Sequence, residues 1–255
     1  MLEFDPIRQH WDNPATESMY DKHWAAAERR LISLYIPPKA PMMLDAGCGE
    51  GEGTFDYATL PGVGEVHGVD YSATRLALAR KRCAGLPNVF FTQADFLAQP
   101  FIGSLYECVI SARLLINFNG WDEQRAVLDK LIRTLKPGGR LLLMEGSKRG
   151  QEQLNAVRRM FGLPDITEQW HNVFLDDDVL DDYLYAHGIT VNNLTGFGAF
   201  FLLTRGIQPA FATDKKLAWD SAFNEIAASP QMAAALPLHE RFSRIRLWVG
   251  TKNRG

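Results

Sequence analysis

The sequence has only three cysteines among its 255 residues, Cys48, Cys83 and Cys108. None of them belongs to a CxxC pair or to a cysteine and histidine spacing of the kind that holds zinc. Two of the three lie inside apolar runs of strand length. We therefore expect buried thiols and no cysteine-based metal centre.

Long apolar runs are also missing. The longest, around Leu141–Met144 and Ala199–Leu203, are far shorter than the ~20 residues that span a bilayer. The first residues, MLEFDPIRQHWDNP, are mixed and charged, which is unlike a signal or transit peptide. The sequence therefore predicts no membrane span and a cytoplasmic location.

There is no excess of positive charge. The formal net charge is -3, and the charged residues are interspersed rather than gathered in blocks. A broad positive field for a phosphate backbone is absent, so we expect no nucleic-acid partner. The apolar share of 46% and the six tryptophans are those of a packed globule.

Apolar runs of strand length alternate with segments of helical apolar spacing. The strand-like runs are 42–44, 66–69, 89–92, 108–111 and 140–144, and later 189–194 and 245–250; helical spacing covers 72–83, 123–135, 151–160, 176–187 and an Ala-rich stretch at 215–235. This alternation indicates an α/β fold with a doubly wound, mostly parallel sheet covered by helices on both faces. Lys136-Pro137-Gly138-Gly139 predicts a helix end and a tight turn.

Nothing divides the chain into halves of different composition, so we expect one domain over residues 1–255. Residues 1–40 form a helical lead-in and residues 41–146 a core. Residues 147–175 and 200–240 are insertions that we expect to form helical caps over a substrate.

The sharpest motif is a glycine-rich turn, Asp45-Ala46-Gly47-Cys48-Gly49-Glu50-Gly51, between an apolar strand and a helix. Glycines there let the chain turn sharply and let a ligand approach the main chain. A dinucleotide fingerprint needs a further glycine at the position of Glu52. The spacing therefore disfavours a nicotinamide dinucleotide.

Two acidic residues follow at the ends of the next two strands. Asp70 lies where a carboxylate accepts hydrogen bonds from ribose hydroxyls. Asp95 is placed to accept from an adenine amino group, with Phe96 or Tyr71 against the ring. A carboxylate at a strand end is also a common helix N-cap or turn former, so only the joint occurrence points to a ligand site.

Four motifs in order, Leu44–Gly51, Gly68-Val69-Asp70, Ala94-Asp95 and Leu135–Leu141, resemble the class I S-adenosylmethionine-dependent methyltransferases. The resemblance spans about residues 40–146. It implies a Rossmann-like methyltransferase fold with an antiparallel last strand, and S-adenosyl-L-methionine as cofactor. It implies that Asp45, Gly47 and Gly49 surround the methionine part of the cofactor, that Asp70 holds the ribose, and that Asp95 with Phe96 holds the adenine. We also expect Cys48, Tyr71 and Ser111 among the cofactor-binding residues.

Methyl transfer from a sulfonium is an in-line displacement, so alignment of the acceptor matters most and a base is helpful but not obligatory. The candidates for a base are His171 in the first insertion, His23 and His10 in the lead-in, and Glu145 at the end of the fifth strand. A packing role for His171 remains an alternative.

After the fourth strand the chain reads Ser111-Ala112-Arg113, without the Asn/Asp-Pro-Pro-aromatic signature of amino-directed DNA methyltransferases. No aspartate stands there to bind magnesium, so we expect metal-independent chemistry. We therefore expect transfer to oxygen, less readily to nitrogen or carbon, of a small molecule.

A weaker resemblance, over Phe161–Pro164, Trp170–Asn172 and Phe200–Arg205, is to uncharacterised methyltransferases of sugar or cell-surface glycan biosynthesis. An anionic acceptor is also consistent with the cations Arg113, Arg158, Arg159 and Arg205. The alternatives are an NAD-dependent Rossmann oxidoreductase, disfavoured by the glycine spacing and by the lack of a Tyr-x-x-x-Lys pair, and a non-catalytic cofactor-binding subunit.

Overall fold

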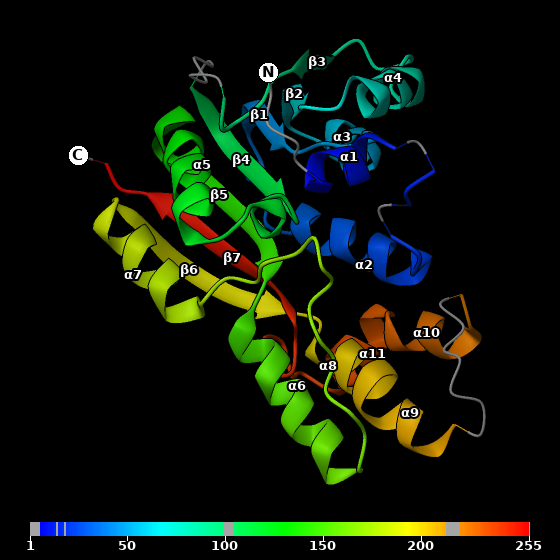
Figure 1. Ribbon diagram of the computed structural model, residues 1–255. Coiled ribbons are helices and arrows are strands. Elements are labelled where there is room, and N and C mark those ends of the chain that lie inside the picture. The colour runs from blue at the N-terminus through cyan, green and yellow to red at the C-terminus, as the bar shows by residue number, and fades with distance from the viewer. Residues whose placement is uncertain (1–5, 14, 18, 99–104, 213–219, 255) are drawn as a thin grey trace.

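The computed structural model describes residues 6–13, 15–17, 19–98, 105–212 and 220–254, and within them one seven-stranded sheet of order β3-β2-β1-β4-β5-β7-β6 (Figure 1). The strands are β1 (Ala40–Ala46), β2 (Val63–Asp70), β3 (Val89–Gln93), β4 (Tyr106–Ala112), β5 (Leu135–Gly146), β6 (Ile189–Gly196) and β7 (Ile245–Lys252). All seven predicted strands are confirmed.

Strands β1 to β5 run parallel, and β7 lies antiparallel between β5 and β6. The order reverses between β1 and β4, which is where ligands bind in a doubly wound sheet, beyond the carboxyl ends of the strands. Because β7 is antiparallel, its first residue, Ile245, pairs with Gly146 at the carboxyl end of β5. The start of β7 therefore lies at the same edge of the sheet as the glycine turn.

Helices cover both faces of the sheet, as predicted. They are α1 (Pro6–Asp12), α2 (Lys22–Ser33), α3 (Glu52–Ala58), α4 (Ala73–Arg82), α5 (Trp121–Thr134), α6 (Lys148–Met160), α7 (Asp177–Ala186), α8 (Gly198–Phe201), α9 (Gln208–Phe211), α10 (Ala222–Ala227) and α11 (Pro230–Ala235), with the 3₁₀ turn η1 (Leu115–Asn117) and the π-helical turn η2 (Leu202–Ile207). The helices α6 and α8 to α11 gather beyond the end of the sheet from which β5 leaves (Figure 1).

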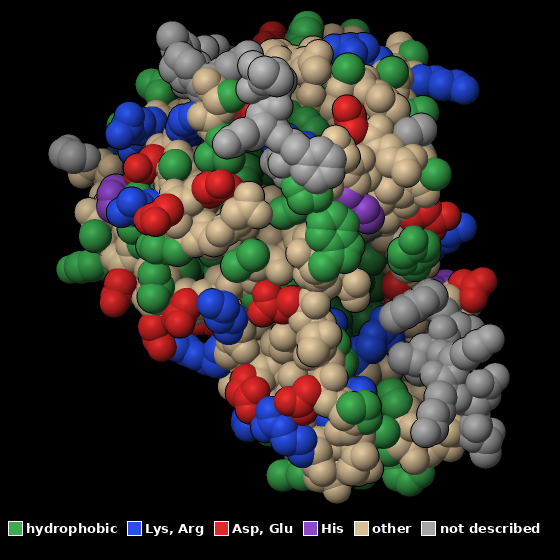
Figure 2. All heavy atoms as spheres, viewed as in Figure 1, with side chains coloured by type: hydrophobic (Ala, Val, Ile, Leu, Met, Phe, Trp, Pro, Cys, Tyr) green, Lys and Arg blue, Asp and Glu red, His purple; other side chains and the backbone are tan. Residues whose placement is uncertain are grey.

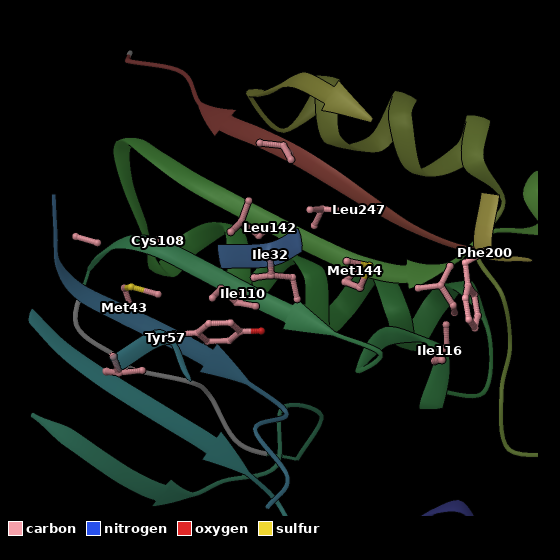
Figure 3. Packing of buried hydrophobic residues seen from close by; sticks show 14 of the residues in the cluster. Ile32, Met43, Tyr57, Cys108, Ile110, Ile116, Leu142, Met144, Phe200 and Leu247 are labelled. Carbon is pink, nitrogen blue, oxygen red and sulfur yellow. The ribbon is translucent and has the colours of Figure 1, made fainter. Parts of the chain in front are cut away.

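Successive side chains of the central strands pack against different helices because they point to opposite faces. On one face Met43, Cys108 and Leu142 join Ile32 of α2 and Tyr57 of α3 (Figure 3). On the other face lies a second cluster, in which Leu44, Val109 and Leu143 pack with residues of α5 and α7. Cys48, Cys83 and Cys108 are all buried free thiols, as expected.

One helix of the lead-in and the first helix of the first insertion begin at residues whose side chains accept hydrogen bonds from the first helical N–H groups. Asp21 accepts from the N–H of Trp24 at 3.0 Å to begin α2, and the Ser147 hydroxyl accepts from the N–H of Gly150 at 2.8 Å to begin α6. The Asp21 N-cap belongs to the lead-in, and the Ser147 N-cap belongs to the first insertion. These segments are therefore fixed in place by local hydrogen bonds as well as by packing.

Two details differ from the prediction. Lys136-Pro137-Gly138-Gly139 does end a helix, but it belongs to β5, because Leu135 already pairs with Tyr106 and a register shift follows. The Ala-rich stretch is not one helix: α10 and α11 are separated at Ser229-Pro230, where proline has no N–H to continue the ladder and Ser229 caps the next helix. Residues 215–219 of that stretch lie outside the described residues.

In the described part of the chain no helix is long and apolar enough to cross a membrane. Side chains of both charges are interspersed over the face of the molecule seen in Figure 2.

Candidate functional site

A large cavity opens at the carboxyl edge of the parallel strands. Its volume is about 1470 Å³, above the 300–1,000 Å³ typical of a site for one small ligand. The glycine turn and the ends of β2 and β3 line one half, which we name the cofactor half. Residues of α2, the 169–174 loop, η2 and the start of β7 line the other, which we name the acceptor half. The cavity thus has room for two molecules.

The glycine turn forms the floor of the cofactor half. The N–H groups of Gly47 and Cys48 both donate to the carbonyl of Val69, at 2.8 and 3.1 Å. Gly47 has φ +71°, and a Cβ there would lie 2.9 Å from the Leu114 side chain. Glycine is therefore required at 47 by both backbone and space.

Two buried carboxylates flank this turn. Asp70 accepts from the N–H of Gly49 and from the N–H of Ser72, each at 2.9 Å, and the backbone of Tyr71 contributes a further hydrogen bond. Asp45 accepts from the Thr54 hydroxyl at 2.6 Å. Burial raises the pKa of both carboxyls, that of Asp45 to about 6. The structure places both in the cavity wall, where the sequence predicted them.

The end of β3 contributes Asp95 and the buried Phe96, and both line the cofactor half. Asp95 forms an ion pair of 2.5 Å with Arg8 of α1. Burial tends to raise the pKa of Asp95, but the N–H of Leu97 and the Arg8 cation outweigh it and lower that pKa. The Tyr71 hydroxyl donates to the carbonyl of Arg8 at 2.8 Å. Arg8 was not anticipated, because nothing in the sequence links residue 8 to residue 95.

Helix α1 lies against α4 beside the cofactor half. The Arg75 Nε donates to the carbonyl of Trp11 at 2.6 Å, and its guanidinium lies over the Trp11 ring. The Ser72 hydroxyl donates to Asp12 at 2.5 Å. With the Arg8 contacts, these bonds make α1 a wall of the cavity, which encloses whatever the glycine turn and Asp70 hold.

Of the four candidate bases, His10 lines the cavity, and so does His171. Its ring stacks on that of His10 with centroids 4.4 Å apart and packs edge-on against Trp11 and Trp170. Burial, with His10 close by, lowers the pKa of His171 to about 4. His171 is therefore neutral near pH 7 but only weakly basic.

Neither His23 nor Glu145 lines the cavity. The Glu145 carboxylate is fully buried and accepts hydrogen bonds from the Ser111 hydroxyl and from the N–H groups of Leu114, Leu115 and Ile116. It anchors η1 to the end of β5 and is not presented to an acceptor. Ser111 is equally buried beneath the cavity, so its predicted contact with the cofactor is replaced by the bond to Glu145.

Sequence reasoning missed Glu28, a carboxylate of α2 that is 4% exposed and lines the acceptor half. Burial raises its pKa, which Arg113, with its Nε 3.3 Å away, partly offsets. Arg113 itself has φ +56°, a strained conformation for a residue with a Cβ. The helical spacing of α2 predicts which face is buried, but the pairing with a residue 85 positions away has no local signal.

Several buried polar atoms in the acceptor half have no hydrogen-bond partner within the described residues. They are the Nε1 of Trp24, the Nδ1 of His171 and the Oδ1 of Asn172. Buried polar groups nearly always have a partner, so these atoms are suited to a polar ligand. Across the described ranges, no group of three His, Cys, Asp or Glu side chains is arranged to hold a metal ion. Metal-independent chemistry stays a prediction.

Comparison with known proteins agrees with this geometry. Residues 43–139 match a family described as "Methyltransferase domain". The chain is 32% identical over 146 residues to a demethylmenaquinone methyltransferase of Clavibacter sepedonicus, with 56% of each protein covered. It is 34% identical over 137 residues to the ubiquinone/menaquinone biosynthesis C-methyltransferase UbiE of Pasteurella multocida, covering 51% of this chain and 50% of the relative. The matches thus span about half the length of these relatives.

Solved structures share the fold over nearly the whole chain. The N-methyltransferase NodS of Bradyrhizobium japonicum, in complex with S-adenosyl-L-homocysteine, aligns with a TM-score of 0.59 at 14% identity, over 98% of this chain and 97% of that one. Magnesium protoporphyrin IX methyltransferase of Synechocystis aligns with the same TM-score at 14% identity, over 97% and 93%. Residues 43–139 are therefore similar to a methyltransferase domain, and the whole chain has the fold of these solved methyltransferases.

Proposed function

We propose that this protein transfers the methyl group of S-adenosylmethionine to an oxygen of a small polar acceptor. The observation that carries the proposal is the division of one cavity into two unlike halves. The cofactor half offers a glycine turn and two buried carboxylates, and the acceptor half offers unpaired polar atoms from α2 and the 169–174 loop. A two-substrate transfer needs such a division.

The residues of the cofactor half fit this cofactor. Asp70 lines the cavity where its carboxylate can accept from ribose hydroxyls, and the open space at Gly49 admits a ligand against the main chain. Phe96 and Tyr71 offer flat apolar surfaces for an adenine ring, and we keep Asp95 as the predicted partner of its amino group beside Arg8. When bound, the cofactor supplies an electrophilic methyl group.

In the acceptor half, the chain's own residues orient the acceptor and receive its proton. We assign proton acceptance to Glu28, because its raised pKa makes it a stronger base near neutrality than His171. His171 closes the cavity through its stack on His10 and, with Asn172, contacts acceptor hydroxyls. Arg113 holds the Glu28 carboxylate in place.

A second candidate is transfer to a ring carbon of a quinol, which the names of the two relatives favour. Such an acceptor is largely apolar and leaves the Trp24, His171 and Asn172 atoms without partners. We therefore prefer a hydroxylated, sugar-like acceptor in the cytoplasm. The absence of a nucleic-acid partner stays a prediction.

The test is transfer from ¹³C-methyl-labelled S-adenosylmethionine to a panel of hexoses, uronic acids, phenols and reduced quinones. The chemical shift of the labelled product distinguishes O-methyl from C-methyl. We expect an O-methyl signal from a sugar-like member. A C-methyl signal from a quinol alone would replace this proposal by the second candidate.

A further inference from the structure

Six arginines line the cavity, and five of them face a carboxylate. The pairs are Arg8 with Asp95, Arg29 with Asp56, Arg75 with Glu50, Arg113 with Glu28 and Arg205 with Asp21. The sixth is Arg244. Within the described residues, no carboxylate or carbonyl oxygen lies within hydrogen-bond or ion-pair distance of its guanidinium, which rests 5.2 Å above the Phe174 ring.

The cations predicted from the sequence for an anion are already engaged. Arg158 donates to the carbonyls of Pro164 and Arg205. Arg159 is exposed and paired with Glu152 and Asp165. Arg244 has no signal in the sequence, because it directly precedes an apolar strand and has no neighbouring motif.

Arg244 is half-buried at the start of β7. Its carbonyl accepts from the N–H of Ser147, directly beyond β5, so it lies at the edge where the parallel strands end. Burial and the nearby Arg205 lower its pKa to about 10, so it stays charged at neutral pH. A half-buried cation at the wall of a cavity, with no carboxylate of the described residues within ion-pair distance, is a suitable partner for an anionic ligand.

The anion belongs to the acceptor half. Strands β4 and β5 lie between β1 and β7, which puts β7 three strand spacings, or roughly 14 Å, from the strand that carries the glycine turn. Phe174, Phe201 and Ile245 line the cavity beside Arg244 and would lie against the body of the ligand. Glu168 acts on Arg244 electrostatically without an ion pair, and its Oε2 accepts from the N–H of Phe174. The planar guanidinium is matched in shape by a carboxylate.

We propose that Arg244 binds a carboxylate of the acceptor, so that the substrate is a monoanionic, hydroxylated small molecule such as a sugar acid. This rests on the proposed function, since it deepens the assignment of the acceptor half. Arg244 is a specificity-determining residue here and takes no part in the methyl transfer itself. The planar guanidinium suits a bidentate carboxylate better than a lysine ammonium does.

The test uses the full chain loaded with S-adenosylhomocysteine, whose own binding is measured first. Arginine side-chain N–H signals are recorded by NMR, and that of Arg244 is assigned by its absence in Arg244→Gln. Acetate, its neutral isostere acetamide, and inorganic phosphate are then titrated. Arg241→Gln is the matched control, because Arg241 also lies over an aromatic ring, that of Phe242, but is exposed and outside the cavity.

We expect acetate to move the Arg244 signal saturably and to bind about tenfold more tightly than acetamide, as one charge-assisted hydrogen bond implies. Arg244→Lys should keep S-adenosylhomocysteine affinity and lose most of this preference. An equal response at Arg241, no response to acetate, or tighter binding of phosphate would overturn the carboxylate assignment. Loss of S-adenosylhomocysteine affinity in Arg244→Gln would assign the cation to the cofactor instead. Failure of the wild-type chain to bind S-adenosylhomocysteine would contradict the proposed function separately.

Discussion

The two halves of the cavity differ in how their polar groups are supported. In the cofactor half, Asp45 is bonded to a residue nine positions away and Asp70 to one twenty-one away. In the acceptor half, Glu28 meets Arg113 across 85 positions, and Asp21 meets Arg205 across 184. The two carboxylates beside the glycine turn are therefore held by neighbouring elements of the sheet, whereas those of the acceptor half, like Asp95 with its partner Arg8, are held by segments far apart in sequence.

We expect this difference to separate cofactor binding, in the first half, from acceptor specificity, in the second. In the cofactor half, backbone N–H groups supply most of the hydrogen-bond partners. In the acceptor half, several buried polar atoms have no hydrogen-bond partner within the described residues, and a ligand could supply one. Changes in the first half should abolish cofactor binding, and changes in the second should spare it. The predictions that follow challenge this separation in turn.

The largest expected effect is on turnover in Glu28→Gln. The amide keeps the shape of the side chain but cannot accept a proton, so kcat should fall by about 10²–10⁴-fold once an acceptor is known. Affinity for S-adenosylhomocysteine, measured by calorimetry, should not change. Glu65→Gln, at an exposed position of β2, is the control. Unchanged kcat together with a low value for His171→Ala would transfer the role to His171.

Asp70→Asn should weaken S-adenosylhomocysteine binding by about 10²-fold. An amide nitrogen would face the N–H of Gly49 or Ser72, and a charged acceptor for the ribose hydroxyls would be lost, at a combined cost of roughly 3 kcal/mol. Isothermal titration measures the change. Asp122→Asn, at a site paired only with Arg125 on the surface, should bind as the wild type does. Wild-type affinity in the Asp70 variant would contradict the assignment of Asp70 to cofactor binding.

Stability should depend on pH through Glu145. Its pKa rises from 4.5 to about 7 on burial, so the folded chain keeps a proton that the unfolded chain has lost. Unfolding then releases that proton, and the free energy of unfolding falls as pH rises from about 4.5 to about 7, by roughly 3 kcal/mol.

Denaturant titrations across this range give the slope. In Glu145→Gln the fall should shrink. What remains comes from other carboxyls whose pKa burial raises, among them Asp45, to about 6, and Glu28 and Asp70. A slope of opposite sign, or the same slope in the variant, would show that Glu145 is ionised in the folded protein throughout.

The smallest effect is expected for Arg8→Gln, which cuts the ion pair between α1 and Asp95. The pair is partly exposed, so its loss should cost about 1 kcal/mol and lower S-adenosylhomocysteine affinity about fivefold. The wild-type affinity should also fall with added salt, and that of the variant less so. If Arg8→Gln lowered S-adenosylhomocysteine affinity as much as Asp70→Asn, α1 would contribute to cofactor binding as strongly as Asp70 does.

The same contrast explains what the sequence could predict. Strand–turn–helix motifs such as Asp45–Gly51 carry their own geometry, and strand ends such as Asp70 reach the same sheet edge once a parallel sheet is inferred. The parallel part of the sheet and the cavity positions of Asp45, Asp70 and Phe96 followed from these rules, whereas the antiparallel β7 was implied by the family resemblance. They are local properties, or consequences of a common topology.

The acceptor half had no such rule. Glu28 and Arg244 face the acceptor half, and Arg8 faces the cofactor half, because of how the lead-in and the last loop pack. A single sequence contains no signal for contacts between residues so far apart. Glu145 and Ser111 were misassigned for the opposite reason: both stand at the correct edge, but they bond to each other beneath the cavity. The position of a residue along a strand predicts at which edge of the sheet it lies. It does not predict whether its side chain is already hydrogen-bonded to another buried residue.

The most direct test of the central claim is calorimetric titration of the cofactor-stripped protein with S-adenosylmethionine, S-adenosylhomocysteine and NAD. The account predicts micromolar binding of the first two and none of NAD. Binding of NAD alone would contradict the account and indicate an oxidoreductase. Binding of none of the three would also contradict it and would point to a subunit whose site is completed by a partner.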